Sequence, residues 1–71
     1  MKVKCIKSLY KRTYKKNAFT NGKKYEVDDK QVEDNIIFII DSEDHSFNFA
    51  TAQDNSTKEM YRFDEYFKYV K

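Results

Sequence analysis

The stretch IIFIID at residues 36–41 places five apolar residues in a row and ends on an acid. Such a density of β-branched and aromatic residues is typical of a β-strand, and polar residues bound it on both sides. The unbroken run predicts burial on both faces, or one packed face and one covered by a neighbouring loop. Residues 46–50, SFNFA, then alternate, with Phe47 and Phe49 on one side. The two segments therefore predict a β-hairpin with its turn at 42–45.

Two further strands are predicted upstream of this hairpin. In KVKCI, residues 2–6, Val3 and Cys5 alternate with lysines, which predicts an inward and an outward face. In FTNGKKYEV, residues 19–27, the Asn21-Gly22 pair is a strong turn signal. Gly22 is the only glycine and the chain has no proline, so we expect the one strained backbone position there. The strand that follows the turn is expected to extend no further than Val32.

The remaining segments have weaker patterns. Residues 11–18 show no apolar periodicity, which predicts an exposed loop. Ser56 with Glu59 three residues later resembles a capping box, and Met60, Phe63 and Phe67 follow at helical spacing. A strand pattern competes with the helix near the end of the chain. We predict a short helix over 57–65 and a last strand over 66–70.

The length of 71 residues predicts a single domain, residues 1–71. Six Phe and six Tyr dominate the apolar residues, so a thin aromatic core is expected, with any site on the surface or in a shallow groove. The predicted core is Val3, Cys5, Tyr25, Val27, Ile37, Ile39, Phe47, Phe49 and Phe63. Five short strands, a long early loop and a helix before the last strand predict a mainly β fold, a small closed barrel without free sheet edges.

The succession KVKCI, FTNGKKYEV, IIFIID, HSFNF and RFDEYFKYV resembles small proteins encoded by Firmicutes phages and prophages. The resemblance covers nearly the whole chain and implies a five-stranded SH3-like barrel with a short helical turn before the last strand. Most such proteins have no known function, so the resemblance implies no catalytic residue. This chain departs from the pattern by SED in place of the usual hairpin glycine and by an unusually basic loop at 11–16.

Composition argues against several classes of function. The single cysteine, Cys5, has no internal disulfide partner, and with one histidine, His45, there is no zinc-ligand spacing. Lysines interrupt the short apolar runs of the N-terminus, so no signal peptide is expected, and no run is long enough to cross a bilayer. We therefore predict a non-enzymatic protein without metal or cofactor, located in the cytoplasm of a bacterial host.

The charges are unevenly distributed. Residues 1–24 contain nine Lys or Arg and no acid, a net charge of +9, whereas residues 25–71 contain five Lys or Arg and twelve acids, a net charge of −7. Such polarity predicts either a partner for the basic end or internal pairing between the two parts of the chain.

Two surfaces are candidate binding sites. The candidate binding loop consists of Tyr10, Lys11, Arg12, Tyr14, Lys15, Lys16, Lys23 and Lys24, where lysines would meet phosphates or acids and tyrosines would stack. The alternative is a solvated loop that keeps the protein in solution. The candidate aromatic interface consists of Tyr61, Tyr66 and Tyr69, expected to be partly exposed. Here the alternative is that the tyrosines only cover the domain with their hydroxyls in water.

These features rank three hypotheses about function. The first is a phage- or prophage-type binding module that modulates a host or phage protein through its surface loops. The second is a nucleic-acid-binding protein that uses the basic region 11–24. The third is a self-associating structural protein, for example a homodimer.

Overall fold

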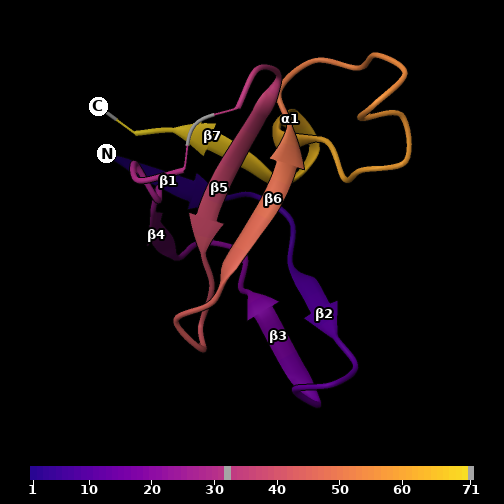
Figure 1. Ribbon diagram of the computed structural model, residues 1–71. Helices are drawn as coiled ribbons and strands as arrows, with labels where there is room; N and C mark the ends of the chain where they lie inside the picture. Colours follow the sequence, from indigo (N-terminus) through magenta and orange to yellow (C-terminus); the bar gives the residue numbers. More distant parts are fainter. Residues whose placement is uncertain (32, 71) are drawn as a thin grey trace.

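The computed structural model describes residues 1–31 and 33–70 (Figure 1). In this part of the chain the secondary structure is β1 (Lys2–Cys5), β2 (Leu9–Lys11), β3 (Lys16–Phe19), β4 (Lys24–Glu26), β5 (Ile36–Ile40), β6 (Ser46–Ala50), α1 (Phe63–Tyr66) and β7 (Phe67–Tyr69). The prediction of a mainly β fold with a short helical turn before the last strand is confirmed.

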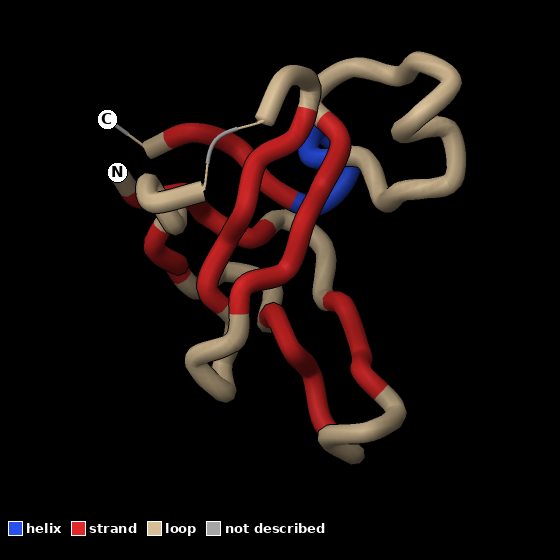
Figure 2. The backbone as a smooth tube through the Cα atoms, in the orientation of Figure 1, coloured by secondary structure: helices blue, strands red, loops and turns tan. Residues whose placement is uncertain are grey.

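The strands form three small antiparallel sheets, ordered β4-β1-β7, β2-β3 and β5-β6 (Figure 2). The predicted five-stranded closed barrel is wrong: among the described residues there are seven strands, and no sheet closes on itself. The physical reason is strand length. β4 has only three residues, and its continuation meets β5 through the single bridge Val27–Ile39 instead of a full ladder.

The β5–β6 hairpin is confirmed, with Ile37 opposite Phe49 and Ile39 opposite Phe47. The turn is held by the Asp41 carboxylate, which accepts hydrogen bonds from the backbone N–H groups of Glu43 (2.8 Å) and His45 (3.0 Å). The second face of β5 is half-buried, and the Asp28 N–H donates to the Phe38 carbonyl beside it. One face is therefore packed and the other lies beside a neighbouring segment, as one of the two alternatives predicted.

The predicted loop at 11–18 is confirmed only for the turn at 12–15, because Lys11 belongs to β2 and residues 16–18 belong to β3. The two strands form a hairpin, with Lys11 opposite Lys16 and a register shift between Leu9 and Tyr10. Sequence periodicity missed these strands because the bulge and the exposed lysines interrupt the alternation.

The turn at Gly22 is confirmed, with φ of 92°. It is not the one strained position of the backbone, because Lys15, Asn35 and Asp44 also have positive φ. Strand β4 ends at Glu26, and Val32, the predicted furthest extent of this strand, lies outside the described residues.

The predicted helix over 57–65 is shorter than expected and begins later, since α1 spans only Phe63–Tyr66. Ser56 does not cap a helix: its N–H and its hydroxyl both donate to the Asp54 carboxylate, as does the N–H of Thr57. Asp54 thus organises a turn where the capping-box pattern predicted a helix start. The last strand is confirmed as β7.

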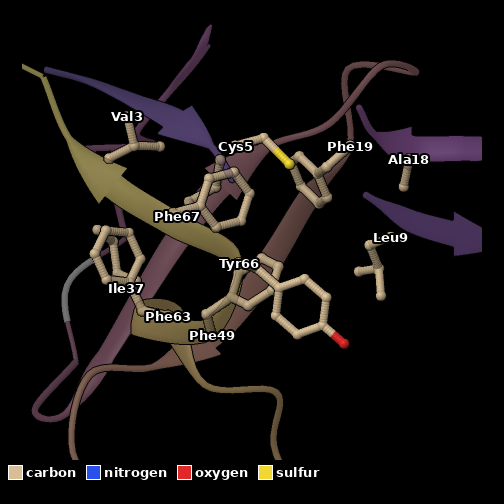
Figure 3. Close-up of a cluster of buried hydrophobic side chains, with 11 residues drawn as sticks. Val3, Cys5, Leu9, Ala18, Phe19, Ile37, Phe49, Phe63, Tyr66 and Phe67 are labelled. Carbon is tan, nitrogen blue, oxygen red and sulfur yellow. The ribbon is translucent and has the colours of Figure 1, made fainter. Parts of the chain in front are cut away.

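The core is a cluster of edge-to-face rings centred on Phe19, which is fully buried (Figure 3). Its ring lies 5.0 Å from that of Phe67 and 5.6 Å from that of Phe49. Of the predicted core, Val3, Cys5, Ile37, Ile39, Phe49 and Phe63 are buried, whereas Tyr25, Val27 and Phe47 are partly buried against the cluster. The buried hydrophobic residues that the prediction omitted are Leu9, Ala18, Phe19, Ala50, Tyr66 and Phe67.

Candidate functional site

A groove of about 310 Å³ lies between β2 and the β6 side of the β5–β6 hairpin. Its lining consists of Leu9, Tyr10, Lys11, Arg12, Phe47 and Tyr61. Three of these residues come from the candidate binding loop and one, Tyr61, from the candidate aromatic interface. The fold therefore joins two surfaces that lie about fifty residues apart in the sequence into one concave site.

The apolar wall of the groove is aromatic. The Tyr61 ring packs 6.1 Å from Phe47 and 6.4 Å from Phe49, yet 48% of Tyr61 stays exposed. Tyr10, on β2, is 60% exposed. Rings that are fixed on one side and open on the other offer flat apolar surface to a ligand at a small cost in conformational entropy.

The groove also carries positive charge. The Lys11 ammonium lies 5.5 Å from the centroid of the Phe47 ring and 4.8 Å from that of Tyr14, within cation–π range. Arg12 is exposed beside it. Within residues 1–31 and 33–70, neither side chain has a carboxylate within 4.0 Å. The groove thus presents two positive charges that no neighbouring acid pairs with.

The hairpin that carries these charges is tied to the rest of the fold through Tyr14. Its hydroxyl donates to the Asp41 carboxylate (2.7 Å) and lies 2.9 Å from Nδ1 of His45. The hydrogen bond to Asp41, with burial and the charges of Asp41 and Glu43, raises the pKa of Tyr14 to about 12. Burial opposes the ionisation of Asp41, but the bonds from Tyr14 and two backbone N–H groups outweigh it and lower its pKa. The β2–β3 turn is therefore held against the β5–β6 turn.

The other basic residues of the candidate loop are not gathered at the groove. Lys16 pairs with Glu43, and Lys15 is exposed at the hairpin turn. Lys23 and Lys24 follow the far end of β3, where Lys24 lies opposite Lys4 on β1. The region 11–24 is consequently divided between two places on the molecule.

Of the two alternatives that the charge asymmetry predicted, internal pairing is confirmed in part, and a partner for the basic end stays a prediction. Among the described residues, three of the nine basic side chains of 1–24 pair with acids from 25–71: Lys2 with Glu26 (3.8 Å), Lys7 with Glu65 (3.7 Å) and Lys16 with Glu43. These pairs are exposed and contribute little to stability. The groove cations belong to the remaining six.

The candidate aromatic interface is not one surface. Tyr66 was expected to be partly exposed, but it is buried, because its ring packs against Phe49 and Tyr61 and the Lys7 ammonium lies over it at 5.2 Å. Burial raises the pKa of Tyr66. Tyr69 is 57% exposed but packs beside Phe63, 4.9 Å away, near the end of β7. Only Tyr61 contributes to the groove.

The groups considered for chemistry are engaged elsewhere. The Cys5 thiol is buried and donates to the Lys7 carbonyl, and burial raises its pKa. His45 contacts the Tyr14 hydroxyl. In the described part of the chain, no group of three or more His, Cys, Asp or Glu side chains is placed to hold a metal ion. Nor does any described helix have the length and apolar character needed to cross a membrane.

Sequence reasoning did not identify Leu9 or Phe47 as residues of the site. The alternation of Phe47 with Phe49 assigned it to the core, but Phe47 lies near the turn end of the β5–β6 hairpin, where it is only partly buried and lines the groove. Comparison with protein-family models, curated proteins and solved structures found no match.

Proposed function

We propose that this chain is a non-enzymatic binding module that holds a host or phage protein in the groove and modulates its activity. The observation that supports this proposal is the meeting of two unpaired cations, Lys11 and Arg12, with the exposed rings of Tyr10 and Tyr61 in one concavity. Tyrosine and arginine are the residue types that most often dominate the energy of protein interfaces.

The rigidity of the site also favours a binding role. Tyr14 and Asp41 fix the hairpin before any ligand arrives, and the Phe47 and Tyr14 rings hold the Lys11 ammonium. A surface that is already ordered loses less conformational entropy on association. The proposed setting is the cytoplasm of a bacterial host, where a lone thiol such as Cys5 stays reduced. The resemblance to phage and prophage proteins supports a target in that cell.

The second candidate is single-stranded nucleic acid, because bases would stack on Tyr10 and Tyr61 while phosphates meet the cations. Among the described residues, the unpaired cations on the β2–β3 hairpin are few: Lys11, Arg12 and Lys15, since Lys16 already pairs with Glu43. Three phosphate contacts would give a slope of log K against log salt of about −2.1 on a single strand. Such weak electrostatic attraction ranks this candidate below a protein partner.

Self-association is the third candidate. Tyr69 is exposed on β7, which is an edge strand of the three-stranded sheet. An open edge with an exposed ring can pair with a second copy. A mass measurement in solution, repeated with Tyr69→Ser, tests this candidate separately from the groove.

The test of the proposed function is photo-crosslinking in the bacterial host. Tyr61 is replaced by p-benzoylphenylalanine, and the same replacement at Tyr69 is the control, since both rings are about half exposed but only one lines the groove. We expect a protease-sensitive adduct from position 61 and none from position 69. A nuclease-sensitive adduct at position 61 would move the assignment to nucleic acid. Equal adducts from both positions would contradict the groove as the binding surface.

A further inference from the structure

The outer edge of β6, beside the groove, has backbone groups that could pair with an added strand. At the end of β6 the Ala50 N–H points away from β5 and donates to the Tyr61 carbonyl at 2.8 Å, and Ala50 forms a parallel bridge with Arg62. The described part of the chain thus pairs with the outer edge of β6, and it does so only at this one position.

Two more positions of that edge are open. The backbone N–H and C=O groups of successive residues point to opposite edges of a strand. Those of Ser46 and Asn48 therefore point away from β5, as those of Ala50 do, while the backbone groups of Phe47 and Phe49 point toward β5. The other end of the hairpin agrees, because the His45 carbonyl accepts from the Asp41 N–H on the β5 side. In the described part of the chain, the outward backbone groups of Ser46 and Asn48 have no backbone partner.

The open edge borders the groove. Phe47 lies between Ser46 and Asn48 and lines the groove, and Tyr61 lines it from the segment that already pairs with β6. Strand β2 lies on the side of β6 that faces away from β5 (Figure 1). It carries Lys11, and Arg12 directly follows it. A segment lying along β6 would therefore have strand edge on one side and two cations on the other.

We propose that the ligand of the groove is a short, extended, acidic segment of the partner protein that adds to β6 as a further strand. This inference rests on the proposed function and specifies its ligand. The ligand backbone pairs with Ser46 and Asn48, an aromatic or branched aliphatic side chain packs on Phe47 and Tyr61, and Asp or Glu side chains meet Lys11 and Arg12. Strand addition to an open edge is an established mode of peptide binding, in which the ladder supplies affinity and the side-chain contacts supply specificity. The charge of the rim selects the acidic partner.

The probe is a displayed library of random nine-residue peptides, selected on the full chain and counter-selected on the double variant Lys11→Glu, Arg12→Glu. We expect enriched peptides to be acidic with one large apolar residue. Each is then synthesised in two forms, with N-methyl groups on alternate residues in one register or the other, so that side chains stay the same while one set of N–H donors is removed. N-methylation of the residues whose N–H groups face β6 should weaken binding at least tenfold, and methylation of the other residues should not. Binding should also slow hydrogen exchange at the amides of Ser46 and Asn48.

The outcomes separate this inference from the proposed function. If enriched acidic peptides bind equally well in both methylated registers, and exchange at Ser46 and Asn48 is unchanged, the groove binds protein through side chains only and the strand addition is wrong. If no peptide is enriched over the charge-reversed variant, the groove does not bind acidic segments and the inference is wrong, whereas the proposed function fails only if crosslinking at position 61 also captures no protein. Direct binding of oligo-dT to the wild type and not to the charge-reversed variant, with no enriched peptide, would contradict both in favour of nucleic acid.

Discussion

Replacement of Phe19 by leucine should destabilise the domain more than the same replacement at a phenylalanine that lies outside the core. Phe19 is fully buried, and its ring lies 4.9–5.8 Å from those of Tyr25, Phe47, Phe49 and Phe67. Aromatic pairs contribute about 0.5–1.5 kcal/mol each beyond buried area. Since the four pairs share one ring and do not add fully, we expect a loss of about 2 kcal/mol. That is a large part of the roughly 4–11 kcal/mol expected for a domain of this length.

The assay is urea unfolding followed by far-ultraviolet circular dichroism. With a slope of about 1 kcal/mol per molar urea, the midpoint of Phe19→Leu should fall by about 2 M. Phe38→Leu is the matched control, because Phe38 is half-buried on the other face of β5 and takes part in none of the ring pairs found among the described residues. Its midpoint should fall by less than half as much. Equal shifts for the two variants would refute the placement of Phe19 at the centre of the core.

Three further perturbations test local parts of the structure. Gly22 has φ of 92° and an added Cβ would meet no atom within 4 Å, so Gly22→Val should cost about 1–2 kcal/mol from backbone strain alone, and Gly22→Asn less; equal urea midpoints for wild type and Gly22→Val would contradict this. The pKa of Tyr14 is raised from 10.0 to about 12, so its contribution to stability is complete below pH 10 and is lost as pH rises toward 12. Thermal melts of Tyr14→Phe should therefore lack that part of the alkaline loss, and an unchanged alkaline profile would disprove the bond to Asp41. The pKa of Asp54 is lowered from 3.8 to about 2 by its bonds to Ser56, Asn35 and Thr57, so its contribution is complete above about pH 4 and is lost as pH falls to 2. In Asp54→Asn, the melting temperature should fall less between about pH 4 and pH 2 than in the wild type. An unchanged fall would show that the turn does not need the carboxylate.

The parts of the fold that could be predicted from sequence are those where hydrophobic alternation and turn residues agree. IIFIID and SFNFA form the longest ladder, and the Asn21-Gly22 turn needs the backbone freedom of glycine, so both follow from local rules. Strands β2 and β3 could not be predicted in this way, because a bulge at Leu9 and Tyr10 breaks the period of two. The capping-box pattern at Ser56 failed because Asp54, two residues earlier, accepts hydrogen bonds from both the N–H and the hydroxyl of Ser56, the two groups that a capping box would use.

The sequence indicated some residues of the candidate site but not that they lie together. The basic residues of the hairpin stood out by charge, and Tyr61 by being an aromatic residue in excess of a small core. Their meeting depends on tertiary contacts, above all the bond from Tyr14 to Asp41, which joins residues 27 positions apart. No local pattern encodes such a contact. The burial of Tyr66 was missed for the same reason, since the rings of Phe49 and Tyr61 cover it only once β6 and α1 have packed.

The most direct test of the groove as a protein-binding surface is the dissociation constant of the crosslinked partner, measured by fluorescence anisotropy against two double variants. Lys11→Gln with Arg12→Gln removes the groove cations, whereas Lys23→Gln with Lys24→Gln removes the same number of positive charges at the far end of β3. We predict that the first pair weakens binding at least tenfold and that the second changes it less than threefold, with both variants retaining the wild-type melting temperature. Equal weakening by the two pairs would mean that the partner responds only to net charge, and the groove would not be its binding site.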